Sequence, residues 1–349
     1  MQALLTTPGR PHSVRVGEVS EPAGPGIRLR TLEIGVCGTD REISEGVFGV
    51  APEGERELVL GHEFLGRVAE DGDGFSLGEL VTATVRRGCG HCEACAESSP
   101  DACDTGDYTE RGITGLHGFA REVVIEDPAA LIAMPESLGR LGVLSEPASI
   151  CARAIRHALH IGHRQLWGPR RALVLGPGAI GLLTTYLLRL EGLEVWTAGR
   201  RTSGPRAELV PACGARYVST SETPLAELRD EVGGFDVVIE AAGDAQLMLE
   251  VLGLLRRNGV GCLLGLDARE RSVAIDGPVV GIDTVIENRV LFGSVNAHRD
   301  DWQAAVAGLE EIRRRWPDAL EAMVGLRVAP DRFAEAFEFR GVKATLVFD

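Results

Sequence analysis

The sequence predicts an α/β protein of two domains, in which a β-rich domain precedes a doubly wound parallel sheet. At 349 residues, the chain is about twice the length of a typical ~150-residue domain. Short apolar runs separated by Gly, Pro and Asp occupy residues 1–125, which is typical of strands joined by turns. From Ala172 onward, apolar strands alternate with helical segments. That alternation favours a parallel sheet covered on both faces.

Each element is predicted from its apolar pattern. In the β-rich part we expect strands at Ile27–Val36, Glu57–Leu60 and Leu80–Val85, and a helix over Pro147–Ile161 follows. The alternating part predicts strands at Ala172–Leu175, Leu193–Ala198, Val237–Ala241, Gly261–Leu266 and Val290–Val295. An amphipathic helix over Asp301–Arg315 and a closing strand at Lys343–Phe348 complete the prediction.

Composition excludes several classes of protein. Acidic residues number 51 against 36 basic ones, a formal net charge of −15, so the chain repels nucleic-acid backbones. It has no run of about 18 apolar residues and no basic-then-apolar leader at the N-terminus. We therefore expect no membrane span, no cleaved signal peptide and a cytoplasmic protein. Lys343 is the single lysine, which leaves a lysine-based mechanism one poorly placed candidate.

Four cysteines with close spacing form the most specific local motif. Cys89, Cys92, Cys95 and Cys103 lie in a loop that contains Gly, Pro and Asp. Four thiolates suit tetrahedral Zn²⁺ and leave no position for a substrate, so we expect a structural zinc site. His91 lies inside the motif and could replace one thiolate. A nucleic-acid-binding zinc ribbon is the alternative from another class, and the acidic net charge disfavours it.

A second set of metal ligands is separate from the first. Cys37 begins the sequence Cys-Gly-Thr-Asp, and His62 lies in Gly-His-Glu. Each follows an apolar run, where a strand end can project a side chain into a cleft. One sulfur and one nitrogen ligand leave room for a carboxylate and water, the arrangement of an open, catalytic Zn²⁺. Such an ion lowers the pKa of a bound hydroxyl.

A glycine-rich turn follows the predicted strand Ala172–Leu175. Gly176, Gly178 and Gly181 fit the pattern G-x-G-x-x-G at the start of a helix. Such glycines permit a tight turn, admit a pyrophosphate and let the helix pack on the strand. The sequence therefore predicts a dinucleotide site.

The end of the next strand indicates which dinucleotide. Arg200 and Arg201 stand where an NAD enzyme would carry a carboxylate. Two guanidinium groups can hold a 2′-phosphate through charge-assisted hydrogen bonds, so we expect NADP to be preferred and NAD to remain possible. The alternative is a solvated pair of surface arginines.

Together these motifs resemble the zinc-dependent medium-chain alcohol dehydrogenase superfamily, and within it the glucose 1-dehydrogenase branch. The segment Gly61–Gly72 looks like the zinc signature of that superfamily. The branch is indicated by Cys37–Ile43, Leu58–Glu63, Arg86–Cys92, Gly118–Pro128, Leu144–Ser149, Asn258–Gly265 and Gly293–His298. The resemblance implies a GroES-like catalytic domain with a structural-zinc lobe over 1–150, a Rossmann domain over 151–297, and a return to the catalytic domain over 298–349.

The resemblance also implies roles for individual residues. The catalytic zinc would lie among Cys37, His62, Glu63 and Glu146, and both glutamates would exchange with water as ligands. Thr39 would bond the reacting hydroxyl, and Asp40 would orient His62. Sugar contacts would come from Thr39, Glu110, Glu146 and Asn296, although Glu110 and Asn296 could instead be surface or turn residues. Cofactor contacts would come from Gly176, Pro177, Gly178, Ala179, Ile180, Gly181, Arg200, Arg201, Leu264, Gly265, Leu266, Ser294, Val295 and Asn296.

The expected function is an NADP-preferring, zinc-dependent sugar dehydrogenase that oxidises an aldose at C1. The alternative substrate is a polyol, a cyclitol or the sugar part of a secondary metabolite. A zinc protein that binds nucleic acid or partners without catalysis is a third hypothesis, which the intact motifs disfavour. We expect a homodimer or homotetramer, with no nucleic-acid or membrane partner.

Overall fold

The chain divides into two compact units in a computed structural model that describes residues 1–348. The first unit comprises Met1–Ser149, Asn296–Glu310 and the chain from Leu320 onward, and the second comprises Ile150–Val295 and Glu311–Ala319. The expected return over 298–349 is thus interrupted, and its last residue, Asp349, lies outside the described residues. Trp316 packs edge-on against Tyr186, with ring centroids 5.3 Å apart, which holds the interrupting stretch in the second unit.

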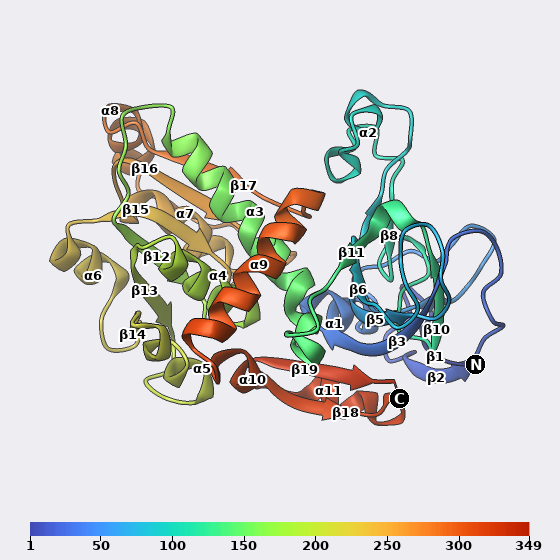
Figure 1. The fold of residues 1–349 in the computed structure, drawn as a ribbon. Coiled ribbons are helices and arrows are strands. Elements are labelled where there is room, and N and C mark those ends of the chain that lie inside the picture. The colour runs from blue at the N-terminus through green and yellow to red at the C-terminus, as the bar shows by residue number, and fades with distance from the viewer. Residues whose placement is uncertain (349) are drawn as a thin grey trace. The chain divides into compact units, whose positions relative to one another are not determined.

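The first unit is built on mostly antiparallel sheets, in which β18 and β19 form a parallel pair (Figure 1). Its main sheet has seven strands, in the order β11 (Leu131–Ala133), β6 (Leu80–Ala83), β5 (Glu63–Val68), β3 (Ile27–Val36), β19 (Lys343–Val347) and β18 (Val324–Val328), with β10 (Val123–Glu126) also paired to β3. A second sheet has the order β2 (Arg15–Glu18), β1 (Gln2–Thr6) and β4 (Leu58–Val59). The long strand β3 has the bounds expected from its sequence.

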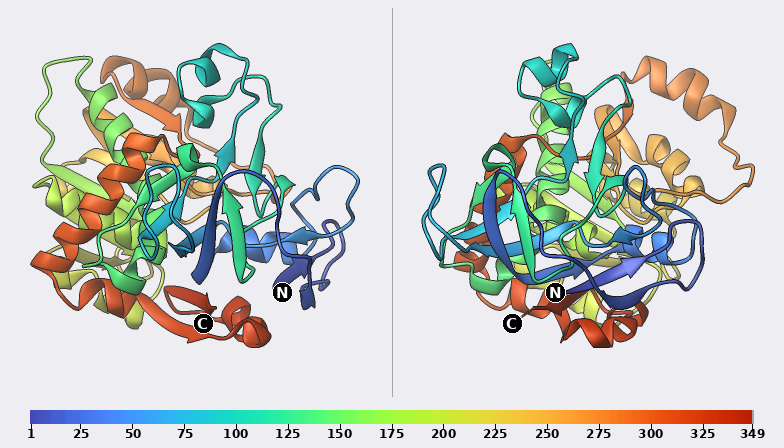
Figure 2. Two further views of the ribbon diagram at one scale, coloured as in Figure 1. Left: turned by 45° about the vertical axis from the view of Figure 1, so that its right-hand side comes forward. Right: turned by 90° about the vertical axis from the view of Figure 1, so that its right-hand side faces the viewer.

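A lobe extends from this unit and carries the four-cysteine motif. Its base is a small sheet of β7 (Arg86–Arg87), β8 (Thr109–Arg111) and β9 (Gly115–Leu116). Between β7 and β8 lies the short helix α2 (Glu93–Ala96). Figure 2 shows the lobe standing away from the sheets of its own unit in both views. From Gly88 to Asp107 the buried residues are Asp101 and Cys103, so the lobe has almost no apolar core and its shape depends on the cysteines.

Short helices complete the first unit. They are α1 (Gly38–Ser44), α10 (Ala319–Met323) and α11 (Phe333–Glu338). Helix α1 follows β3 directly, and Cys37 is its N-terminal flanking residue. Two longer helices, α3 (Ser145–Gly162) and α9 (Arg299–Arg315), continue from one unit into the other along the chain.

The second unit is a parallel sheet of six strands, which confirms the predicted fold class. The order is β14 (Arg216–Ser219), β13 (Glu194–Gly199), β12 (Arg171–Leu175), β15 (Phe235–Glu240), β16 (Leu255–Leu263) and β17 (Val290–Gly293). The helices are α4 (Ala179–Leu190), α5 (Pro205–Glu208), α6 (Leu225–Val232), α7 (Ala245–Leu254) and α8 (Thr284–Ile286). The strand order reverses between β12 and β15, and ligands of such sheets bind at this switch point.

Strand β16 differs from the prediction of Gly261–Leu266. It begins at Leu255 and ends at Leu263. The backbone N–H groups of Leu264 and Gly265 turn to the carbonyl oxygen of Glu240, so these residues leave the sheet ladder. Within residues 1–348, no helix is long and apolar enough to cross a membrane.

Candidate active site

Cys37 and His62 meet at the ends of neighbouring strands. Cys37 directly follows β3, and His62 directly precedes β5, which pairs with β3. The Sγ atom of Cys37 lies 3.1 Å from Nε2 of His62. Gly61 has a positive φ of 89°, and this turn brings His62 to the strand end. A soft sulfur and an imidazole nitrogen thus face the same point, as ligands of one zinc ion do.

Asp40 lies behind this pair. Its Oδ2 accepts a hydrogen bond from the backbone N–H of Cys37 at 2.9 Å, and its Oδ1 lies 3.5 Å from Nδ1 of His62. Asp40 is buried and can orient the imidazole from the side away from Cys37, as carboxylates beside metal-binding histidines do. Thr39, on the same turn of α1, is half-buried.

Glu63 is held by a residue that the sequence analysis regarded as poorly placed. The Nζ atom of Lys343, on β19, lies 2.6 Å from both carboxylate oxygens of Glu63, on β5. A side chain at Gly35, on the intervening strand β3, would collide with the Glu63 carboxylate. Burial lowers the pKa of Lys343, but the charges of Glu63 and Cys37 outweigh it and raise that pKa. The only sequence signal was that Lys343 is unique.

Glu146 completes a second group of ligand atoms. It lies in the first turn of α3, and its carboxylate, that of Glu63 and the imidazole of His62 have ligand atoms within 4.8 Å of one another. Burial is the main cause that raises the pKa of Glu146 to about 7. Burial opposes a charged His62, yet Cys37 and Asp40 raise its pKa well above the ordinary value. The surroundings therefore favour a cation.

The donor set fits a zinc ion. Cys37, His62 and Asp40 also form a group with ligand atoms within 4.8 Å, so His62 belongs to both groups. Sulfur, nitrogen and carboxylate donors are those of open zinc sites, and a site with this set retains a position for water or substrate.

The four cysteines of the lobe form a closed set. Cys89, Cys92, Cys95 and Cys103 have Sγ atoms within 4.8 Å of one another. A Cβ atom at Gly88 would collide with Sγ of Cys95, so the loop needs glycine there. Hydrogen bonds, first that from the His91 backbone, lower the pKa of Cys89 to about 6. This favours the thiolate that zinc binds.

His91 lies at the rim of this cluster. Its side chain is exposed, and Nδ1 lies 3.0 Å from the carbonyl oxygen of Cys89. The group of four ligand atoms contains the cysteines without His91. The alternative in which His91 replaces a thiolate therefore lacks support in the geometry.

Glu110 and Asn296, which are 186 residues apart in sequence, are hydrogen-bonded to each other. Nδ2 of Asn296 donates to Oε1 of Glu110 at 3.1 Å. Asn296 has a positive φ of 64°, and its Oδ1 accepts from the backbone N–H of Ala297 at 2.8 Å. The structure thus brings together two residues that the resemblance assigned to sugar hydroxyls. Asn296 is buried and Glu110 half-buried, so neither is a freely solvated surface residue.

The glycine-rich turn lies at the switch point of the parallel sheet. Gly176 has a φ of 99°, and a Cβ there would lie 2.9 Å from Ala242. A Cβ at Gly181 would collide with the carbonyl oxygen of Gly176. A Cβ at Gly178 would meet nothing within 4 Å. The first and third glycines thus serve the fold, whereas the second leaves open space at the N-terminus of α4, where a pyrophosphate binds in such turns.

Arg200 and Arg201 follow the end of β13 and are exposed. Their carbonyl oxygens accept hydrogen bonds from Ser219 and Tyr217, at 3.3 and 2.6 Å respectively. Within the described chain, neither guanidinium has an ion pair or a hydrogen bond. Both positive charges are therefore available to an anionic ligand.

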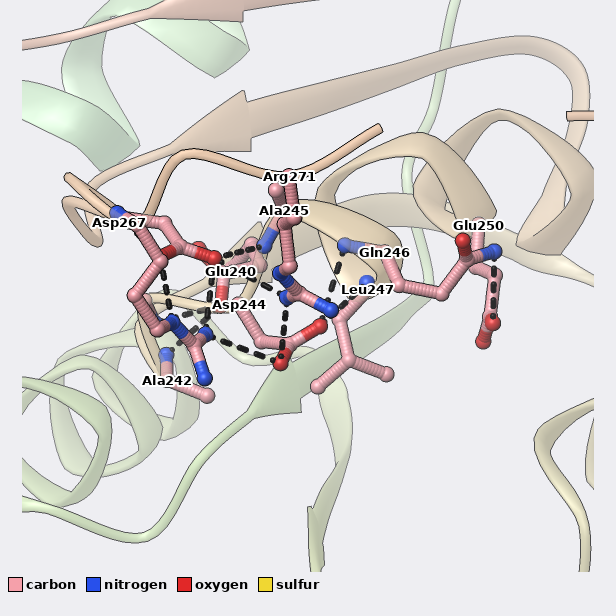
Figure 3. A network of polar contacts seen from close by, with 11 residues as sticks. Glu240, Ala242, Asp244, Ala245, Gln246, Leu247, Glu250, Asp267 and Arg271 are labelled. Carbon is pink, nitrogen blue, oxygen red and sulfur yellow. Dashed lines mark hydrogen bonds and ion pairs between the residues drawn. The ribbon is translucent and has the colours of Figure 1, made fainter. Parts of the chain in front are cut away.

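The loop after β16 is fastened to the start of α7 by an ion-pair cluster (Figure 3). Nη2 of Arg271 lies 3.0 Å from Oδ2 of both Asp244 and Asp267. Asp244 caps α7, and Asp267 accepts from the backbone N–H of Ala245 at 2.9 Å. The sequence analysis missed this cluster, because Asp244 and Asp267 lie outside the glycine-rich turn and the two metal-binding motifs.

The ion-pair cluster lies next to residues that were expected to contact the cofactor. It constrains the stretch Leu264, Gly265 and Leu266, and a Cβ at Gly243 would lie 2.6 Å from the carbonyl oxygen of Leu266. On the next strand end, Ser294 has a buried Oγ atom without a hydrogen-bond partner in residues 1–348, and Val295 is exposed.

Comparisons with known proteins cover the whole chain. Residues 139–347 match the family model for the C-terminus of glucose dehydrogenase, and residues 25–136 match that for the alcohol dehydrogenase GroES-like domain. A glucose 1-dehydrogenase of Methanocella arvoryzae is 42% identical over 345 residues, 97% of this chain and 96% of that protein. Glucose 1-dehydrogenase 2 of Vulcanisaeta moutnovskia is 40% identical, over 92% of this chain and 91% of that protein.

Solved structures agree with these matches. The glucose dehydrogenase of Haloferax mediterranei, in complex with NADP, Zn and gluconolactone, superposes with a TM-score of 0.93. It is 33% identical, and the alignment covers 100% of this chain and 99% of that one.

Proposed function

Because the chain belongs to the glucose 1-dehydrogenase branch of the zinc-dependent medium-chain alcohol dehydrogenase superfamily, we propose that it oxidises an aldose at C1 to the lactone and reduces a nicotinamide cofactor. The hydroxyl at C1 loses a proton, and the C1 carbon loses a hydride. The observation that carries this proposal is the match to glucose 1-dehydrogenases along 92–97% of the chain. The group of potential zinc ligands around His62 in the first unit supports the same activity.

The residues that would hold the catalytic zinc are Cys37, His62 and one or both of Glu63 and Glu146. When bound, zinc polarises the hydroxyl and lowers its pKa, while the oxidised nicotinamide accepts the hydride. Asp40 fixes the imidazole of His62. Lys343 neutralises Glu63, so that carboxylate can remain buried until it is needed as a ligand.

Thr39 is proposed to hydrogen-bond the reacting hydroxyl. It lies two residues after Cys37, at the start of α1, and it is half-buried. A threonine hydroxyl both donates and accepts, so it can accept a hydrogen bond from the substrate hydroxyl and hold that hydroxyl in place. Glu110 and Asn296 are proposed to bind other sugar hydroxyls. A largely shielded pair of polar side chains suits a sugar better than an alkyl alcohol.

NADP is the proposed cofactor. The 2′-phosphate would meet the unpaired guanidinium groups of Arg200 and Arg201, and the pyrophosphate would lie over Gly178. The Haloferax mediterranei relative was solved with NADP, which supports the same choice here. NAD remains usable, because loss of the phosphate leaves exposed arginines rather than buried, unpaired charges.

A substrate screen tests the proposal. Purified, zinc-loaded protein is offered aldoses, polyols and cyclitols with NADP⁺ or NAD⁺, and reduction is followed at the nicotinamide absorbance. We expect turnover with an aldose, and a lactone or its aldonic acid as the product by mass spectrometry. Turnover confined to polyols or cyclitols would show that the substrate is not an aldose, while the zinc-dependent oxidation of a hydroxyl would stand. No turnover with any of the three classes would refute the proposal.

A further inference from the structure

Arg86 connects Glu110 to the base of the cysteine lobe. The two residues are direct partners across the antiparallel pair of β7 and β8, so their side chains project to the same face. Nε and Nη2 of Arg86 each lie 3.0 Å from Oε1 of Glu110. Both side chains are largely shielded from solvent, with 9% and 14% of the side chain exposed respectively. An ion pair in such surroundings is far stronger than one at the surface.

Contacts at all three nitrogens and on one face fix the Arg86 guanidinium. Its Nη1 donates to the carbonyl oxygen of Asp101 at 2.9 Å, and Cζ lies 3.8 Å above the ring centroid of Tyr108. A planar group with all three nitrogens engaged and one face on an aromatic ring has a single orientation. Arg86 is therefore a rigid support. Asp101 lies two residues before Cys103, so one of the contacts that hold Arg86 comes from the cysteine lobe.

The two oxygens of Glu110 have different surroundings. Oε1 accepts from Arg86 and also from Nδ2 of Asn296. No donor among residues 1–348 reaches Oε2. Arg86 and Asn296, the two partners of Oε1, also line a cavity of about 450 Å³ beside the lobe, and Glu110 is not among its lining residues. One oxygen of the carboxylate is thus anchored and the other remains an acceptor.

We infer that Arg86 is a positioning residue for sugar recognition: it anchors Glu110 through Oε1 so that Oε2 accepts one hydroxyl of the aldose. This inference rests on the proposed function and adds to it the device that fixes the sugar contact. It also links the lobe to the substrate, because the contact of Arg86 with Asp101 depends on the folded lobe.

Kinetics of Arg86→Ala and Arg86→Lys test the inference. We expect Arg86→Ala to raise the KM for the aldose about tenfold, which corresponds to about 1.4 kcal/mol. We expect kcat to change less than about threefold and the KM for NADP⁺ to stay unchanged, since the contact is made to a non-reacting hydroxyl. Arg86→Lys should recover only part of the affinity, because an ammonium group cannot hold the carboxylate in the same two-nitrogen geometry.

A double-mutant cycle separates positioning from general destabilisation. If Arg86 acts through Glu110, Arg86→Ala should change sugar KM little in a Glu110→Gln background. A series of deoxy-aldoses adds a second readout, since the analogue that lacks the Glu110-bound hydroxyl should bind wild type and Arg86→Ala equally well. Arg87→Ala is the matched control. It lies on the same strand and pairs with Glu126 at 2.7 Å, so it should lower stability without changing sugar KM.

The outcomes distinguish the inference from the proposed function. If wild type turns over an aldose but the two substitutions have additive effects, or if Arg87→Ala raises sugar KM as much, Arg86 has no positioning role. If Arg86→Ala does not fold, the cycle is carried out with Arg86→Lys, and additivity there equally overturns the inference. If wild type oxidises no aldose, both the proposed function and the inference fail.

Discussion

Lys343 holds Glu63, one of the potential zinc ligands, from a strand near the C-terminal end of the chain. It is the single lysine of the chain, it is only 3% exposed, and it pairs with the equally buried Glu63. Removal of one partner of a buried ion pair costs more than the pair itself contributes, since the remaining charge has no compensation. The two positions therefore need to be tested together.

We predict that Lys343→Met lowers the free energy of unfolding of metal-free protein by about 3–5 kcal/mol. The double variant Lys343→Met with Glu63→Gln should recover at least half of that loss, because no buried charge is then unpaired. Denaturant unfolding of both variants and wild type measures the effect. A single variant as stable as wild type would show that Glu63 does not depend on Lys343.

Arg200 and Arg201 are the residues that we expect to choose the cofactor. A hydrogen bond to a charged group is worth about 1.5–3 kcal/mol, and exposure to solvent reduces it. The double variant Arg200→Ala with Arg201→Ala should thus weaken NADP binding about ten- to a hundredfold and leave NAD binding nearly unchanged. Direct titration of both cofactors measures this. High salt should narrow the preference of wild type, and equal binding of NAD and NADP by wild type at low salt would contradict the assignment.

At the scale of elements, one carboxylate joins three strands at the base of the lobe. Glu126, on β10, lies 2.7 Å from Nη2 of Arg87, on β7, and 2.9 Å from Nε of Arg111, on β8. Its side chain is 2% exposed. Burial raises the pKa of Glu126, but the two guanidinium groups outweigh burial and hold it below the ordinary value.

This depressed pKa makes the stability of the first unit depend on pH. The contribution of Glu126 is fully present above the pKa of an unfolded glutamate, about 4.3, and is lost as pH falls through the lower pKa of the folded state. Glu126→Gln should lower the free energy of unfolding by about 3 kcal/mol at neutral pH. It should also reduce the loss of stability between about pH 5 and pH 3.

Thermal unfolding across that pH range checks the prediction. Glu136→Gln is the control. Glu136 pairs with Arg67 at 2.6 Å on the surface, where such a pair is worth less than about 1 kcal/mol. If both variants lose stability equally, burial of the Glu126 cluster has no special role.

The elements were predictable to the extent that they depend on local pattern. The strand Ile27–Val36 has the expected bounds, because Pro25-Gly26 precedes its apolar run and Cys37-Gly38 follows it. The end of β16 was wrong by three residues, because Leu264 and Gly265 both donate to the carbonyl oxygen of Glu240, the last residue of β15, where the pairing of the two strands ends. The apolar pattern of residues 261–266 gives no information about an acceptor that lies on another strand.

The same limit applies to the site. Spacing alone marks the four cysteines and the glycine-rich turn, because their ligands are close in sequence. The contacts that fix the remaining groups join residues that are far apart. Lys343 and Glu63 are separated by 280 residues, and Asn296 and Glu110 by 186. Only the fold, in which β19 pairs with β3 and β3 with β5, brings Lys343 to Glu63.

At the scale of the whole molecule, the first unit contains two groups of potential zinc ligands with different roles. The lobe group consists of four cysteines and is closed, whereas the group around His62 mixes sulfur, nitrogen and carboxylate donors. Zinc in a closed site of a small lobe couples metal binding to folding. In the open group, Asp40 accepts from the backbone N–H of Cys37, and Lys343 pairs with Glu63, so protein contacts also fix these residues. Loss of metal should therefore affect stability at the first site and activity at the second.

We predict two zinc ions per chain in the loaded protein. Cys92→Ser should leave one ion and lower the thermal unfolding temperature, because the lobe has few apolar contacts to replace the metal. Cys37→Ser should also leave one ion, but it should abolish activity with a much smaller loss of stability. Cys213→Ser, at a buried cysteine of the second unit outside both groups, should keep two ions and activity. Metal analysis and thermal unfolding measure all three variants. A reduced, folded, active wild type without zinc in the lobe would contradict the structural role, because a closed site releases its metal less readily than one with an open position.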